Sequence, residues 1–95
     1  MGTTSYISSA SAEAATLSMP SHQTGDLIIA FAWRGPSNTI PTIPSGWTKI
    51  LNNSTGSNAS VCAYKIAASA SEAFGTWTNA TMVGVGVWRD SDNYL

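Results

Sequence analysis

An uninterrupted run of seven apolar residues, Leu27 to Trp33, narrows the folds open to this chain. It lies between the turn signal Gly25-Asp26 and Arg34. Such a run is typical of a strand covered on both faces, because exposing either face would leave large side chains in water. Residues 26–33 are therefore predicted to form a buried central strand. Since no helix-length period occurs anywhere, the chain is predicted to be all-β.

Shorter alternating segments, separated by Gly, Pro, Asn and Ser, surround this run, which is typical of a sandwich. The pattern predicts an antiparallel β-sandwich of about seven strands in one domain, residues 1–95, with a flexible acidic tail at 90–95. Gly84 and Gly86 alternate with Val83, Val85 and Val87, so the glycine face can admit a large ring, expected to be tryptophan. The predicted strands are 4–10, 14–19, 26–33, 47–51, 59–67, 75–78 and 81–89.

Proline and polar residues mark the connections between these strands. Prolines recur through residues 39–46, which predicts an extended loop across the surface. Residues 52–58 are predicted to connect two strands of a hairpin, and residues 67–73 to form a loop or a single turn.

The composition excludes several classes of partner. Only 9% of the residues are charged, the net charge is −1, and the four cations are dispersed, so nucleic acid and anionic lipid are not expected as partners. No apolar segment approaches the length of a membrane span, and no secretory signal begins the chain. Cys62 is the only cysteine and is expected to be a small buried hydrophobe.

Titratable residues do not form a recognisable catalytic or metal-binding motif. His22 and Asp26 could join a serine in a triad, but no serine has the G-x-S-x-G context. Glu13 and Glu72 could serve as general acid or base, yet nothing in the sequence places them together. The segment beginning at Asp90 resembles the start of a calcium loop but lacks its glycine and glutamate. We therefore expect no catalytic, metal or cofactor site, and no enzyme.

Four tryptophans remain as candidates for contact. Trp47, Trp77 and Trp88 fall at strand starts or inside strands, where tryptophan is usually core or corner packing. Trp33 lies beside Arg34 and the proline-rich segment, which makes it the best candidate for a contact surface.

The order of several short motifs resembles a group of bacteriophage virion proteins, and related bacterial surface modules, with a jelly-roll-like β-sandwich. The resemblance covers roughly residues 13–89. It is specific to the fold more than to the role, since such sandwiches serve as head decoration proteins, fibre domains and sugar-binding modules. The motifs are Leu17-Ser18-Met19-Pro20, Gly25-Asp26-Leu27-Ile28-Ile29-Ala30, Pro44-Ser45-Gly46-Trp47-Thr48, Tyr64-Lys65-Ile66-Ala67, Gly75-Thr76-Trp77-Thr78 and Val85-Gly86-Val87-Trp88-Arg89.

This resemblance implies a capsid decoration (cement) protein, made in the host cytoplasm, that binds the major capsid protein on the virion surface and stabilises the assembled head. Longer members of the group continue with further strands after the position of Trp88-Arg89. Subunit association can cover the edges and faces that missing strands would leave, so a symmetric homo-oligomer, a trimer, is expected. The expected partner-binding residues are Tyr6, Trp33, Arg34, Ile40, Ile43 and Trp47.

The alternative is a receptor-binding or carbohydrate-binding module of a tail fibre or a cell-surface protein. It requires exposed aromatic side chains on which sugar rings can stack, with Trp33 as the leading candidate.

Overall fold

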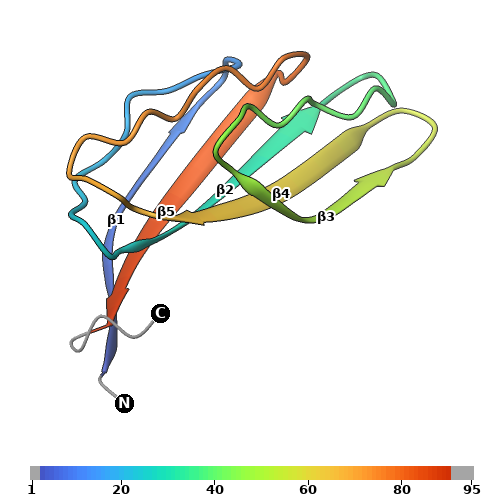
Figure 1. Cartoon of the computed structure of the whole chain (residues 1–95). Coiled ribbons are helices and arrows are strands. Elements are labelled where there is room, and N and C mark those ends of the chain that lie inside the picture. The colour runs from blue at the N-terminus through green and yellow to red at the C-terminus, as the bar shows by residue number, and fades with distance from the viewer. Residues whose placement is uncertain (1–2, 91–95) are drawn as a thin grey trace.

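The computed structural model describes residues 3–90, which form one antiparallel sheet of five strands (Figure 1). The strand order is β1-β5-β2-β4-β3, so the apolar run lies on the middle strand. The all-β prediction is confirmed for this part of the chain, which contains no helix that could span a membrane. The strands are β1 (Thr4–Ala12), β2 (Leu27–Arg34), β3 (Thr48–Ser54), β4 (Ala59–Ile66) and β5 (Met82–Asp90).

Pairing between the strands is regular in the middle of the sheet and irregular at its edges. β2 pairs without interruption with both β4 and β5. β1 pairs with β5 through a register shift between Tyr6 and Ser8, and β3 pairs with β4 through a shift between Lys49 and Leu51. Such shifts bend a strand and are common at sheet edges. The predicted hairpin connection is confirmed, closed by Thr55 N–H donating to Asn58 O at 2.8 Å.

One face of the sheet is covered by connecting segments, which form a layer without strands. Side chains at alternate positions of β2, β4 and β5 point into this layer and are buried. Trp47, Phe74 and Trp77 come from the connecting segments and pack on one another with ring centroids 5.5–5.8 Å apart. The sheet contributes Ile28, Ala30, Ala32, Val61, Ala63, Val83, Val85 and Val87 to the same core.

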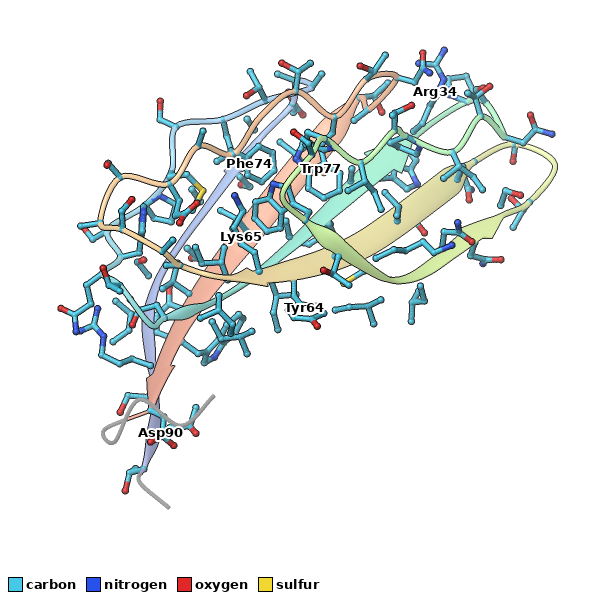
Figure 2. All side chains as sticks on the ribbon, in the orientation of Figure 1. Arg34, Tyr64, Lys65, Phe74, Trp77 and Asp90 are labelled. Carbon is cyan, nitrogen blue, oxygen red and sulfur yellow. The ribbon has the colours of Figure 1, made fainter. Side chains whose placement is uncertain are left out.

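Two hydrogen bonds from the indole rings to the backbone hold this cluster together. The Nε1–H groups of Trp47 and Trp77 both donate to the carbonyl of Phe74, at 3.1 and 3.2 Å. Each indole ring is thus buried with its one polar atom, Nε1, in a hydrogen bond, as is usual for buried tryptophan. Figure 2 shows Phe74 and Trp77 side by side over the sheet, whereas Tyr64 points away from them.

The predictions of strands at 14–19 and 75–78 are wrong. Both segments lie in the irregular layer, and Trp77 N–H donates to Ala15 O at 2.7 Å where they meet. The alternation of Leu17 and Met19 reflects side chains that pack on the core, and it does not mark a ladder of hydrogen bonds. Gly75 has φ of 82°, a left-handed conformation that interrupts extended backbone. Residues 3–90 therefore form one sheet, and a second sheet of a sandwich is not seen among them.

The prediction that the apolar run is buried on both faces is also corrected. Phe31 is 49% exposed and Trp33 is 40% exposed, while Ile28, Ala30 and Ala32 are fully buried. The reason is that the connecting segments cover only one face of the sheet. The proline-rich segment 39–46 belongs to this covering layer, since Pro41 is buried and Ile43 packs on the core.

Candidate interaction surface

The sheet face opposite the connecting segments, which we call the open face, presents large apolar side chains to solvent. They come from all five strands and lie in register. At the centre, Phe31 on β2 pairs with Gly84 on β5 and with Cys62 on β4. The apolar residues of the open face are Tyr6, Leu27, Ile29, Phe31, Trp33, Leu51, Cys62, Tyr64, Ile66, Met82 and Trp88.

Two glycines shape the centre of the open face. The Phe31 ring lies over Gly84 and the Trp88 ring lies over Gly86, so closely that a Cβ atom at either glycine would overlap the ring. Tyr6 then meets Trp88 edge to face, with ring centroids 6.3 Å apart. The predicted approach of large rings to both glycines is confirmed, although one ring is phenylalanine and only the other is tryptophan.

The exposed part of the open face has an apolar centre, a polar rim and no charged side chain. The central strands β5, β2 and β4 supply most of its aliphatic and aromatic side chains, whereas the edge strands add hydroxyl and amide groups beside Tyr6 and Leu51. Lys65 and Arg89 occupy alternate positions that point to the other side, and Asp90, which continues the open-face alternation at the end of β5, is buried. This distribution resembles the buried centre and polar rim of a protein interface. The rim residues include Ser9, Ser11, Thr48, Asn53 and Ser60.

The charged groups of the covered side are tied to one another and to backbone. Asp26 is fully buried, and its carboxylate accepts hydrogen bonds from Arg89 Nε at 2.7 Å and Arg89 Nη2 at 2.8 Å. Gln23 N–H donates to the same carboxylate at 2.9 Å. The hydrogen bond to Arg89 is the main reason that the pKa of Asp26 lies below its usual value, and burial opposes this effect.

A hydrogen bond between His22 and Glu72 joins two connecting segments. Glu72 N–H donates to His22 Nε2 at 2.8 Å, so Nε2 carries no proton and Nδ1 donates to Pro20 O, also at 2.8 Å. The Glu72 carboxylate accepts from Ala68 N–H and from Lys65 Nζ, and its pKa is lowered chiefly by the former. Lys65 also lies over the Trp47 ring, 4.5 Å from its centroid.

The structure does not assemble the sequence-based candidates for catalysis or metal binding. Both nitrogens of His22 contact groups other than Asp26, and Asp26 is engaged by Arg89. Among residues 3–90 there is no group of three or more His, Cys, Asp or Glu side chains that could hold a metal ion. Asp90 ends β5, and the rest of the calcium-like segment and of the predicted tail lies outside the described residues.

The six expected partner-binding residues lie in three different places. Tyr6 and Trp33 are on the open face but at opposite ends, since Tyr6 is level with Leu27 across β5. Leu27 and Trp33 are six residues apart along β2, a distance of about 20 Å. Arg34 is half-buried and donates from Nη1 to Asn79 O at 2.8 Å. The other three, Ile40, Ile43 and Trp47, are half-buried or buried against the core.

Sequence reasoning missed most of the open face. The strand pattern places Phe31 and Tyr64 on central strands and identifies Ile66 and Leu51 only as strand residues. The signal that could have found them is the two-sided apolar pattern of β2 and β4, because each face of such a strand needs a separate cover. Cys62 is half-buried on this face and not part of the core.

Comparisons of this chain with protein-family models, with curated proteins and with solved structures find no match. A function therefore has to be inferred from the open face and from the motif resemblance.

Proposed function

We propose that this chain is a structural protein of a phage virion, a capsid decoration protein that assembles on the head and stabilises it. The observation that carries the proposal is the open face, which exposes no charged side chain and whose seven most exposed large apolar side chains keep 37–61% of their surface in water. Apolar patches of this extent on soluble proteins mark interaction sites. In the proposal the open face is the inner face of a jelly-roll-like sandwich that is completed by association.

The contact with the major capsid protein is assigned to the end of the sheet at Trp33 and Arg34. Trp33 is 40% exposed there, and its ring packs against Gly35, 2.5 Å from the position that a Cβ atom would occupy. Arg34 anchors this end by its hydrogen bond to Asn79 O. A contact of modest size on each of several capsid subunits adds up through multivalency, so weak individual contacts suffice to hold a shell.

Immunogold labelling of phage particles from the source of this chain tests the location. Labels spread over the head are expected, while labels at the tail tip or unlabelled particles would refute the decoration role. A second measurement compares Trp33→Ala with Thr24→Ala for retention on purified heads. Loss of retention is expected for Trp33→Ala only, because Thr24 is exposed in the turn before β2, at the other end of the sheet from Trp33.

A receptor- or carbohydrate-binding module is a second candidate, favoured by the exposed aromatic rings of Phe31 and Trp33 on the same face of the sheet. Sugar rings stack on such surfaces, and the described rim supplies hydroxyl groups for hydrogen bonding. In this case Trp33→Ala would abolish retention on immobilised bacterial glycans while leaving the circular dichroism spectrum unchanged. Wild-type protein that passes through such glycan columns unretarded would exclude the second candidate.

A further inference from the structure

We infer that the open face binds a second copy of this chain face to face, so that two sheets form one closed sandwich. This names the partner of the proposed assembly surface and in that sense rests on the proposed function. Two stacked sheets lie about 10 Å apart with their inner side chains interdigitated, which is the packing that an apolar sheet face ordinarily receives.

The exposed area matches what a stable dimer needs. Six side chains of the open face, apart from Trp33 at the capsid-contact end, are 37–61% exposed: Tyr6, Phe31, Leu51, Tyr64, Ile66 and Met82. With roughly 200 Å² for each large side chain, they offer about 580 Å². A standard interface buries about 800 Å² per partner, and the half-buried Leu27, Ile29 and Trp88 with the polar rim supply the remainder.

The symmetry of the open face favours an identical partner. In a two-fold contact the same patch meets itself, so any charge on the patch would meet a like charge. The open face exposes none, since Asp90 at the end of β5 is only 4% exposed. Apart from Tyr6 and Leu51, the edge strands are polar on this side, so a half-turn places rim on rim and apolar centre on apolar centre. A partner of different sequence would gain nothing from this internal symmetry.

The same geometry indicates two copies and not the three expected from the sequence. A ring of three joins two different patches on each chain, head to tail. The open face is one continuous patch, and stacking two sheets covers all of it except its margin at Trp33, the end of the sheet assigned to the capsid contact. Phe31 occupies the middle strand of the sheet and stands nearest the two-fold axis, with Cys62 beside it.

Sedimentation equilibrium of the full chain at micromolar concentration is the primary test. The expected mass is twice 9.9 kDa. Phe31→Lys and Phe31→Glu should each raise the dissociation constant about 100-fold or more, because two like charges then meet near the axis. An equimolar mixture of the two variants should recover the two-chain mass, since opposite charges meet. Thr78→Lys is the matched control, an exposed position in the connecting layer, and should keep the wild-type mass.

Cross-linking of wild-type protein makes the test independent of those variants folding. A bis-maleimide with a spacer of about 10 Å should join Cys62 of one copy to Cys62 of the other. Cys62→Ser should give no product. Far-UV circular dichroism of each variant checks its fold, and the Tyr64→Lys and Tyr64→Glu pair replaces the Phe31 pair if either of those does not fold.

A one-chain or three-chain mass for the wild-type protein would overturn the inference, as would a two-chain mass that folded Phe31→Lys and Phe31→Glu variants both keep with unchanged affinity. Heads labelled by antibody together with a one-chain mass would retain the proposed function and reject only the pairing. A two-chain mass with the Cys62 product and unlabelled particles would retain the pairing and reject the decoration role.

Discussion

Replacing Asp26 by Asn would remove the one fully buried carboxylate described in this fold while keeping its shape. Asp26 accepts two hydrogen bonds from Arg89 and one from Gln23 N–H. Its own backbone joins the same junction, because Ala67 N–H donates to Asp26 O at 2.8 Å. The Asp26 side chain therefore connects the start of β2 to the end of β5 and to the preceding turn, whereas its backbone carbonyl makes the connection to the segment after β4.

The expected loss follows from what the variant retains. The amide oxygen introduced by Asp26→Asn would still accept from one donor, but Arg89 would lose its counter-charge. Removing one partner of a fully buried pair costs about 3–5 kcal/mol. The Arg89 side chain is 29% exposed and can turn to water, so we expect a smaller loss of about 2–3 kcal/mol. For 95 residues the whole free energy of unfolding is about 5–14 kcal/mol, which makes this loss easy to measure.

The pH dependence has a definite sign. Because the folded pKa of Asp26 lies below its unfolded value, the pair contributes its full stability above the unfolded value, near pH 4. That contribution is lost as the pH falls through the folded pKa, when the carboxylate takes up a proton. The difference in unfolding free energy between wild type and Asp26→Asn should be constant from about pH 5 to 8 and should shrink below about pH 4.

Urea unfolding at fixed protein concentration, followed by tryptophan fluorescence at pH 7 and at pH 2.5, measures both quantities. Glu13→Gln removes a carboxylate at an exposed position and is the matched control, expected to change stability by no more than about 0.5 kcal/mol. Equal stabilities of Asp26→Asn and wild type at pH 7 would refute the role of the pair. A difference of the same size at both pH values would refute its assignment to the carboxylate charge.

Three further substitutions probe the core and the open face. Gly84→Val should displace the Phe31 ring and cost about 1–3 kcal/mol in urea unfolding, and an unchanged midpoint would contradict that packing. Trp77→Ala should leave a cavity in the core cluster and lower the free energy of unfolding by about 3–5 kcal/mol, which gives a large fall in melting temperature. A fall of only a few degrees would contradict the core position of Trp77. Glu72→Gln should lower the free energy of unfolding by about 0.5–1.5 kcal/mol at pH 7. The urea midpoint of this variant is compared with that of Glu13→Gln.

The sequence was sufficient to predict those strands whose apolar pattern is strong. Two segments form central strands, as their apolar patterns predict: the run at 27–33 and the alternation of valine and glycine at 82–88. A short apolar run and an apolar alternation are both typical of strands. The prediction of core packing is confirmed for Trp47 and Trp77 but not for Trp88, which is half-buried on the open face. These features depend on local pattern, which a single chain displays directly.

The sequence was insufficient where tertiary packing imitates a strand pattern. Leu17 and Met19 alternate with polar residues because one side of an extended segment rests on the core, and no neighbouring strand is needed for that. Residues 39–46 form the predicted extended loop, but Ile43 also packs on the core, since an extended proline-rich segment can cover a sheet as well as lie free in solvent. Which segments cover which face is a long-range property, and periodicity does not carry it.

The open face links the strongest sequence signal to the proposed assembly. The run from Leu27 to Trp33 places apolar side chains on both faces of β2, so each face needs its own cover. Connecting segments cover one face with Trp47, Phe74 and Trp77. The other face has the same apolar character and is exposed in the single chain. An apolar strand face that the fold does not bury internally is stabilised when association buries it, so the pattern that determines the position of β2 also supports the proposed pairing of two sheets.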